Sequence, residues 1–282
     1  MRLSTPLVIL SLVFAISIQT VCAQEIGLQL YSLREQFSKD VTGTMAKVKA
    51  MGVTEIEMGS TYGLSFPEFI KLIALNNLKV ISFGTNFERL EKFPQAVADE
   101  ARSYGAKYVV VFWIPHDGDI FTINDVQRAT EVFNKAGKVM AQNGLLLCYH
   151  PHGYEFQIHE KGTLFDVMMK SFDKRYVYFE MDVFWIKQAG QDPLALLKKY
   201  SSRWILMHLK DRKKGTPDSM NGQVDLDSNV VLGTGDVGIE ALYKEARKNG
   251  IQHFFIEDES SVSEEQIPKS IAYLKTLNSK SN

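Results

Sequence analysis

Cysteine is nearly absent from this sequence, whose 282 residues include only Cys22 and Cys148. Cys22 lies in an N-terminal segment that we expect to be removed, which leaves one thiol. A single thiol cannot form an internal disulfide, so the stability of the fold must come from a packed core. A chain of this length can bury roughly three quarters of its unfolded surface, and single α/β barrels often have about 250 residues. We therefore expect one domain.

A strong excess of one charge is also missing. The sequence has 32 Lys and Arg residues against 33 Asp and Glu residues, and it contains no run of five or more like charges. Proteins that bind the phosphates of nucleic acids usually carry a clear positive excess or a basic cluster. The charge pattern therefore argues against a nucleic-acid-binding surface.

Long hydrophobic runs are confined to the N-terminus. Residues 1–23 combine an early Arg2, an apolar stretch and the small-residue ending "VCA", which is the layout of a secretory signal peptide. The apolar stretch is shorter than the roughly 20 residues that a membrane-spanning helix needs. We expect cleavage after Ala23 and an exported protein, periplasmic or extracellular, without a membrane span. A lipid anchor on Cys22 is an alternative that Val21 fits poorly.

Short apolar or β-branched runs alternate with amphipathic ones throughout residues 24–282. Eight runs are typical of strands: 26–32, 55–60, 79–84, 108–114, 145–150, 177–183, 204–210 and 253–259. Eight strands alternating with helices predict a single-domain (β/α)8 TIM barrel. A doubly wound open sheet is the main competitor, but no glycine-rich phosphate motif follows the first strand.

The segments between these runs show helical spacing of apolar residues. Helices are predicted over 41–52, 65–77, 93–105, 123–144, 238–250 and 263–277. Several of them end in a residue that readily adopts the left-handed conformation of a helix C-terminus: Gly52, Asn77, Gly105, Gly144 and Gly250. The longest irregular piece, 211–237, follows the seventh strand, and we interpret it as an active-site loop.

Polar side chains interrupt the ends of the last four predicted strands. They are His150 with His152, Asp182, His208 with Lys210, and Glu257. The C-terminal ends of barrel strands meet at one mouth, and buried carboxylates or imidazoles are costly unless they are paired or ligated. Asp182, His208 and Glu257 therefore predict a site for one divalent cation, with His150 or Glu155 as the fourth ligand. Imidazole and carboxylate donors without thiolate suit Mn²⁺, Co²⁺, Zn²⁺ or Mg²⁺.

Other residues near the predicted mouth are candidates for binding a substrate. They are Glu57 on the second strand, Trp113 and His116 after the fourth, and His152. Trp113, Trp185 and Tyr31 could equally belong to the core or form an apolar wall for a sugar ring. Lys210 is a candidate electrophile or phosphate partner, and it could instead pair with Asp211 or Asp182.

Several of these segments resemble the xylose isomerase-like TIM barrels known as sugar phosphate isomerases/epimerases. The resemblance covers nearly all of residues 24–282, and it is most specific in "YHPHGYEF", "MDVFW", "MHLKD", "LGTGDV" and "IEDE". It implies that Asp182, His208 and Glu257 hold one divalent metal. The family's fourth ligand is a glutamate on the fifth strand, and His150 stands at that position here.

This difference bears on the expected reaction. In family epimerases the two glutamate ligands carry protons on opposite faces of a hydroxyketone, a role that falls here to Glu257 and, if its loop folds back, Glu155. The resemblance thus implies a metal-dependent sugar isomerase or epimerase. With His150 as the ligand, a lyase, dehydratase or hydratase acting on a keto-sugar or keto-glycoside is the alternative, similar to the inosose dehydratase branch.

Two further expectations concern the substrate and a competing class of protein. Because phosphorylated sugars are cytoplasmic metabolites, an exported enzyme is expected to act on a non-phosphorylated sugar as its small-molecule partner. The competing hypothesis is a sugar-binding barrel without catalytic activity, which would hold no metal. The oligomeric state is left open by the sequence.

Overall fold

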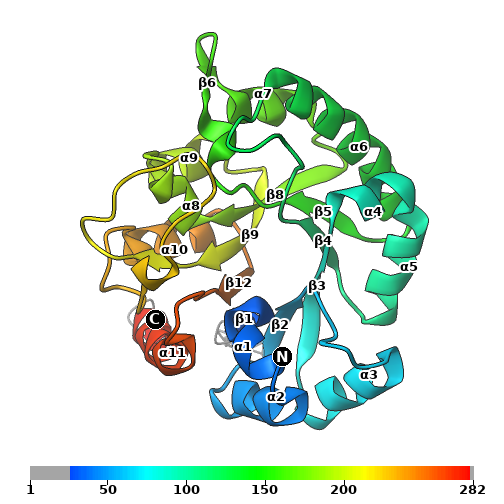
Figure 1. Cartoon of the computed structure of the whole chain (residues 1–282), viewed down its shortest axis with the longest axis vertical. Coiled ribbons are helices and arrows are strands. Elements are labelled where there is room, and N and C mark those ends of the chain that lie inside the picture. The colour runs from blue at the N-terminus through cyan, green and yellow to red at the C-terminus, as the bar shows by residue number, and fades with distance from the viewer. Residues whose placement is uncertain (1–25, 280–282) are drawn as a thin grey trace, which may run out of the picture.

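The protein forms a closed barrel of eight parallel strands surrounded by helices (Figure 1). The structure, a computed structural model, describes residues 26–279. The barrel strands are β1 (Gly27–Gln29), β2 (Glu55–Met58), β3 (Lys79–Thr85), β4 (Tyr108–Val111), β5 (Leu146–Tyr149), β8 (Val177–Asp182), β9 (Trp204–Leu209) and β12 (His253–Ile256). All eight predicted strands are confirmed, and so is the (β/α)8 TIM barrel.

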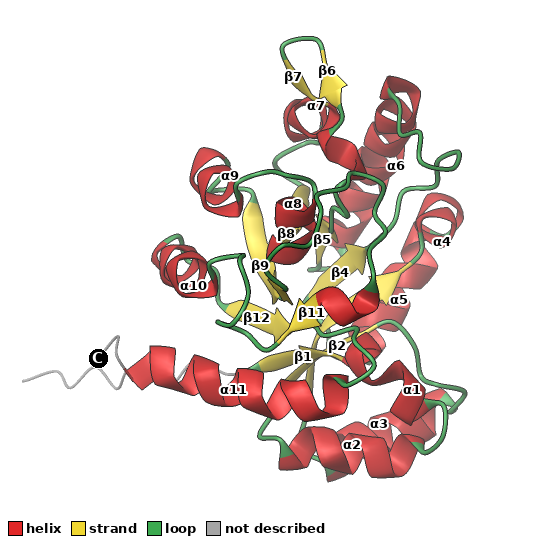
Figure 2. Ribbon diagram, turned by 60° about the vertical axis from the view of Figure 1, so that its left-hand side comes forward, coloured by secondary structure: helices red, strands yellow, loops and turns green. Residues whose placement is uncertain are grey.

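The helices lie around the barrel, as Figures 1 and 2 both show. They are α1 (Arg34–Phe37), α2 (Val41–Ala50), α3 (Phe66–Leu75), α4 (Phe87–Lys92), α5 (Pro94–Ser103), α6 (Ile123–Gln142), α7 (Leu164–Ser171), α8 (Val183–Gln188), α9 (Pro193–Lys199), α10 (Ile239–Lys248) and α11 (Ser263–Ser279). The six predicted helices are all present. The five residues predicted to end them have positive φ angles, which confirms that interpretation.

The first strand is shorter than predicted. It ends at Gln29, whose side-chain oxygen accepts a hydrogen bond from the Tyr31 amide and starts the 3₁₀ helix η1 (Leu30–Leu33). This turn directs the chain across the mouth of the barrel, so that Tyr31 is half exposed there. A polar side chain that bonds its own backbone ends the strand earlier than the hydrophobic pattern indicates.

Two short antiparallel sheets lie outside the barrel, and the sequence pattern missed both. One joins β10 (Asp211–Arg212) to β11 (Asn229–Val230) and encloses part of the segment predicted to be irregular. That segment also contains η3 (Leu226–Ser228). The other, β6 (Ile158–His159) with β7 (Gly162–Thr163), is a hairpin that projects away from the barrel in Figures 1 and 2.

Two expectations concern membranes and export. Within residues 26–279, no helix combines the length and the apolar character needed to cross a membrane. The predicted signal peptide, residues 1–23, lies outside the described residues.

Aromatic side chains fill much of the space between the strands and the helices. Trp204 is 1% exposed and stacks on Phe165, with ring centroids 5.6 Å apart, and it meets the edge of Phe179 at 5.7 Å. Cys148, the cysteine within residues 26–279, is free, so large buried rings contribute much of the burial free energy of this part of the chain.

Replacing Trp204 with Ala should lower the free energy of unfolding by about 3–5 kcal/mol, because the truncation removes a large buried ring and leaves a cavity. Trp113→Ala is the matched control, since Trp113 is 40% exposed and its truncation should cost clearly less than that of Trp204. Denaturant titration followed by circular dichroism measures both values. Equal destabilisation by the two variants would contradict this description of the core.

Candidate metal and substrate site

The register of the barrel brings the predicted metal-binding residues together. Asp182 lies opposite His208 on neighbouring strands β8 and β9. His208 in turn pairs with Phe255 of β12, two residues before Glu257. His150 directly follows β5, the neighbour of β8. Four side chains that are far apart in the sequence therefore meet at the C-terminal ends of adjoining strands.

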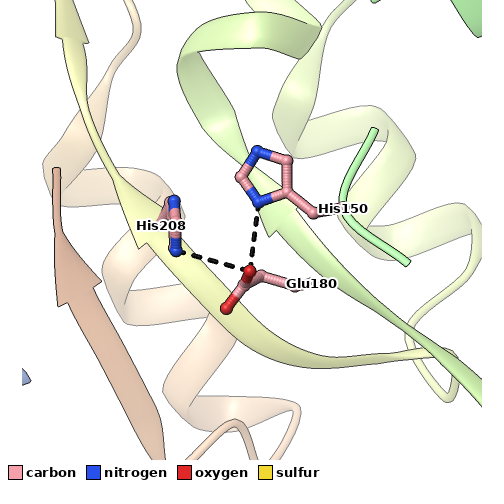
Figure 3. Close-up of side chains that lie close together, drawn as sticks. All are labelled: His150, Glu180 and His208. Carbon is pink, nitrogen blue, oxygen red and sulfur yellow. Dashed lines mark hydrogen bonds and ion pairs between the residues drawn. The ribbon is translucent and has the colours of Figure 1, made fainter. Parts of the chain in front are cut away.

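The imidazole rings of His150 and His208 both face the carboxylate of Glu180 (Figure 3). His150 Nδ1 is 3.0 Å from Glu180 Oε2, and His208 Nε2 is 3.3 Å from the same oxygen. Glu57 Oε1 lies 2.6 Å from His208 Nε2. Each imidazole thus has a fully buried carboxylate on one side, an arrangement that fixes the orientation of metal-binding histidines.

The opposite nitrogens of the two rings face a second group of carboxylates. His150 Nε2 is 3.6 Å from Asp182 Oδ2. His208 Nδ1 is 3.3 Å from Glu257 Oε2 and 3.8 Å from Asp182 Oδ2. Donors that lie about 2.1 Å from one cation are themselves roughly 3–3.5 Å apart, so these separations suit a shared ion.

Asp182 uses its two carboxylate oxygens for different purposes. Oδ1 accepts hydrogen bonds from the backbone amides of Phe184 at 2.7 Å and Trp185 at 3.0 Å, which caps the N-terminus of α8. Oδ2 is buried and has no hydrogen-bond partner within residues 26–279, and the same is true of His150 Nε2. Unpartnered buried polar atoms are rare, and two of them side by side indicate a missing ligand.

Two groups of side chains could hold a metal ion, and they share His208. In the first, His150, Glu180 and His208, the facing atoms already lie within hydrogen-bonding distance of one another. In the second, Asp182, His208 and Glu257, Asp182 Oδ2 lacks a hydrogen-bond partner in the described part of the chain, and Glu257 borders the main cavity. The second group, extended by His150 Nε2, therefore fits a divalent cation better.

The electrostatic environment keeps these ligands in different protonation states. Burial, together with the neighbouring His208, holds the pKa of His150 well below its usual range, so this imidazole is neutral. Burial also works to lower the pKa of His208, but the carboxylates of Glu180, Glu57 and Glu257 outweigh it and hold that pKa well above its usual range. Burial raises the pKa of Asp182 to about 6.

Lys210 and Glu257 form a buried ion pair beside this cluster. Lys210 Nζ is 3.2 Å from Glu257 Oε2 and also contacts the carboxylate of Glu259. It lies 5.1 Å from the ring centroids of Phe184 and Trp185. Although burial opposes the shift, Lys210 and His208 hold the pKa of Glu257 well below its usual range. Lys210 therefore pairs with Glu257 and Glu259 and not with Asp211 or Asp182.

The carboxylate of Asp211 has a separate task in the loop after β9. It accepts hydrogen bonds from the backbone amides of Gly233 and Gly235, both at 2.9 Å, and of Val237 at 3.2 Å. The amides of the "LGTGDV" segment thus surround an acidic group of the chain itself. This closes the loop that carries residues 222–226 over the mouth.

A cavity of about 890 Å³ opens above the cluster. His150, His152 and Glu257 form its floor, and Tyr31, Phe112, Trp113 and Trp185 supply aromatic walls; Gly222, Gln223, Val224 and Leu226 border it from the long loop. Tyr31 and Trp113 are 50% and 40% exposed, so they offer open ring faces. The segment interpreted as an active-site loop therefore does border the cavity.

Six predicted site residues do not border this cavity: Asp182, His208 and Lys210 lie in the cluster beside it, and the other three are Glu155, His116 and Glu57. The carboxylate of Glu155 contacts the Tyr149 hydroxyl and accepts hydrogen bonds from the amides of His152 and Gly153, so it faces the loop and does not reach the cluster. His116 packs behind Trp113, with ring centroids 4.9 Å apart. Glu57 is fully buried, and its carboxylate contacts the Nε2 atom of His208. Of the two alternatives for the fourth ligand, these contacts therefore disfavour Glu155 and leave His150.

Glu180 is the residue of the cluster that sequence reasoning missed. It is fully buried and sits two positions before Asp182 in β8. Residues two apart on a strand share a face. The acids Glu180 and Asp182 in "FEMD" could therefore have been predicted to point to the same side of β8. Glu180 was not predicted because it lies within an apolar strand, and only the last polar residue of that strand, Asp182, was considered.

Comparison with known proteins identifies the family. The model of the xylose isomerase-like TIM barrel family matches residues 45–277, and the chain belongs to that family. An inosose dehydratase of Clostridium perfringens (strain 13 / Type A) is 27% identical over 240 residues, which are 75% of this chain and 80% of that protein. A sugar phosphate isomerase/epimerase from Parabacteroides distasonis is 26% identical, with a TM-score of 0.72 over 89% of this chain and 98% of that structure.

Two more distant neighbours share the fold and were solved with a metal. A xylose isomerase-like TIM barrel protein from Mycobacterium smegmatis in complex with magnesium is 14% identical, with a TM-score of 0.70 over 91% of this chain and 97% of that one. The IOLI protein with a bound zinc atom is 13% identical, with a TM-score of 0.71 over 91% of this chain and 98% of that one.

Asp182→Asn should weaken divalent-metal binding at least tenfold, because the amide replaces the charged oxygen that faces the cluster. Helix α8 should keep its cap, since Asn is as good an N-cap as Asp. The control is Asp192→Asn, which alters a similar cap at the start of α9, where Oδ1 accepts from Leu194 and Ala195. Elemental analysis after dialysis against Zn²⁺ or Mn²⁺ measures the effect, and equal metal content in both variants would contradict the assignment.

Glu155→Gln should flatten the dependence of stability on pH. Burial raises the pKa of Glu155 from 4.5 to about 7, although hydrogen bonds from Tyr149 and from backbone amides work against the shift. The folded state therefore binds a proton more tightly than the unfolded state, so stability falls as pH rises from about 4.5 to about 7. The difference amounts to on the order of 3 kcal/mol. Urea titrations of both proteins across this window measure it, and parallel curves would refute it.

Proposed function

We propose that this member of the xylose isomerase-like TIM barrel family is a divalent-metal-dependent lyase that removes water from a β-hydroxyketone of a cyclic polyol or sugar. The observation that carries the proposal is the composition of the cavity floor. It combines a carboxylate and imidazole donor set with a further neutral imidazole, His152, while the second carboxylate that an epimerase would use, Glu155, faces away.

The proposed ligands are Asp182, His208, Glu257 and His150. A divalent cation bound by them would supply Lewis-acid polarisation of a ketone oxygen and of a neighbouring oxygen. The ion is one of Mn²⁺, Co²⁺, Zn²⁺ or Mg²⁺, and the zinc and magnesium neighbours support this set. Glu180 and Glu57 hold the two imidazoles in the orientation that this ligation needs.

His152 is the proposed proton carrier. Its ring borders the cavity and lies 4.7 Å from the ring of His150. Burial lowers the pKa of His152 to about 4, so the ring is neutral and able to accept a proton. Negative charge that develops on the substrate next to it would stabilise the protonated ring.

The proposed reaction balances with one proton carrier. His152 takes the proton from the carbon next to the carbonyl, and the C–H electron pair forms a carbon–carbon double bond as the β-carbon–oxygen bond breaks. His152 then returns the proton to the departing hydroxide, which leaves as water. Epimerisation needs carriers on both faces of the ring. Glu257 suits that role poorly because, against the effect of burial, Lys210 and His208 hold its pKa well below the usual range, which makes it a weak base.

The relatives also favour a lyase over an isomerase or epimerase. The inosose dehydratases match most of this chain, and their name describes water loss from a cyclic keto-polyol. Isomerisation or epimerisation, the first expectation from the sequence, is supported by the name of the Parabacteroides neighbour and by the general character of the family. A binding barrel without catalysis is expected to hold no metal, so the clustered donors of Asp182, His208 and Glu257 favour an enzyme.

The location of the protein belongs to the proposal as well. The sequence of residues 1–23 supports export, and an exported enzyme would meet non-phosphorylated substrates. Of the cations near the cluster, Lys210 is neutralised by two carboxylates, which also argues against a phosphate group at that position.

Incubation of the metal-loaded protein with inosose in D₂O should produce an enone absorbance and a product one water lighter by mass spectrometry. His152→Asn should reduce this rate by about 10²–10⁴-fold without loss of bound metal, because the variant lacks the proton carrier. His159→Asn, on the projecting hairpin, is the control and should keep full activity. Deuterium incorporation without loss of water would instead establish an isomerase or epimerase, and no reaction with any keto-polyol tested would overturn the lyase.

A further inference from the structure

Two polar side chains at the border of the main cavity have no part in the proposed reaction. They are Arg34, which directly follows η1, and Tyr62, which lies in the loop between β2 and α3. In the closed barrel β1 and β2 are neighbours, and β5, which precedes His152, lies across the barrel from β1. A ligand that contacted these two side chains and His152 would therefore span the cavity.

Arg34 is held in place by bonds to neutral groups. Its guanidinium donates to the backbone oxygens of Tyr31 at 3.3 Å and Glu259 at 3.0 Å, and it lies 4.6 Å from the Tyr31 ring centroid. These bonds occupy two of the five N–H groups of a guanidinium. Within residues 26–279 the guanidinium forms no ion pair. Arg34 therefore offers a positive charge and further N–H donors at the border of the cavity.

The acids around Arg34 do not neutralise its charge. Glu259 gives its carboxylate to Lys210 and only its backbone oxygen to Arg34. Glu257 pairs with Lys210 as well. Glu35, the acid next to Arg34 in the sequence, is exposed and does not border the main cavity. An anion in the cavity would therefore meet a cation that these carboxylates leave uncompensated.

Tyr62 adopts a backbone conformation that is strained for an aromatic residue. Its φ is 53°, in the left-handed region that bulky side chains rarely adopt. The Tyr62 amide donates to Ser60 Oγ at 2.9 Å, and the Tyr62 ring stacks on Phe37 with centroids 4.2 Å apart. These contacts fix the ring at the border of the cavity. Strained residues held in this way cluster at functional sites.

The Tyr62 hydroxyl is close enough to Arg34 to be affected by its charge. Burial and the neighbouring Tyr31 raise the pKa of Tyr62, and Arg34 works against this shift. The hydroxyl therefore stays protonated and can donate a hydrogen bond. A guanidinium fork together with a hydroxyl donor matches the two oxygens of a carboxylate.

We propose that Arg34 and Tyr62 bind a carboxylate of the substrate, so that the substrate is a hydroxylated cyclic keto acid. The ketone lies above His150 and Glu257, the reacting C–H bond faces His152, and the carboxylate lies at the opposite edge of the cavity. A carboxylate carries one negative charge, which one guanidinium compensates, whereas a phosphate carries nearly two. This inference rests on the proposed function for the keto ring, but the carboxylate site is testable by binding alone.

Isothermal titration of the metal-loaded protein with glucuronate, its methyl ester and glucose tests this site without catalysis. Glucuronate should bind about tenfold more tightly than the two neutral sugars, because it alone carries a charge. Arg34→Gln should remove this preference and leave glucose binding unchanged. Tyr62→Phe should weaken glucuronate binding about three- to tenfold, as expected for one hydrogen bond. Arg175→Gln is the matched control, since Arg175 also lies over a tyrosine ring, 5.0 Å from the Tyr176 centroid, but does not border the cavity.

Three outcomes would overturn the carboxylate site. The first is equal affinity for glucuronate, its methyl ester and glucose. The second is a glucuronate preference that survives Arg34→Gln, because the carboxylate would then be bound by the metal. The third is tighter binding of glucose 6-phosphate than of glucuronate. The two proposals fail separately, because inosose carries no carboxylate: its loss of water reports the reaction, and the glucuronate preference reports the anion site.

Discussion

The packing of two imidazoles against two buried carboxylates is the constraint on which the site depends. Glu57 and Glu180 are both fully buried and close to each other, and burial together with Glu57 holds the pKa of Glu180 well above its usual range. Two buried carboxylates this close cannot both be ionised unless positive charge lies beside them, and the raised pKa of Glu180 reflects this. His208 supplies part of that charge from one side. A cation held on the far side of His150 and His208, between Asp182 and Glu257, would supply the rest.

Several residues serve both the fold and the site, so the site is rigid. Asp182 ends β8, caps α8 with one oxygen and faces the cluster with the other. The capped helix brings Phe184 and Trp185 against Lys210, and Lys210 keeps Glu257 ionised. Each of these links is a short contact between neighbouring elements. The positions of the proposed ligands therefore follow from helix capping and strand register, which do not require a bound ligand to form.

The sequence predicted the features that depend on periodicity and on strand ends. All eight barrel strands and the pairing of Asp182 and His208 at one mouth follow from alternation and parallel topology. The direction of Glu155 could not be predicted, because it depends on the amides exposed by Gly153, whose φ of 102° turns the loop. Glu180 lay within a strand and not at its end. The β10–β11 pair is held by Asp211 contacts across more than twenty residues, which no local pattern reveals.

Because its carboxylate points away from the metal-binding cluster, Glu155 has a positioning role in the proposed reaction and does not carry a proton. Its hydrogen bonds to the amides of His152 and Gly153 fix the backbone that carries the proton carrier. The Gly153 position has little room for a side chain, since an added Cβ would lie 3.2 Å from the Trp185 carbonyl oxygen. An acid that could have carried a proton is thus used to position an imidazole. With one carrier on one face of the ring, returning the proton to a departing hydroxyl becomes the reaction that the geometry supports.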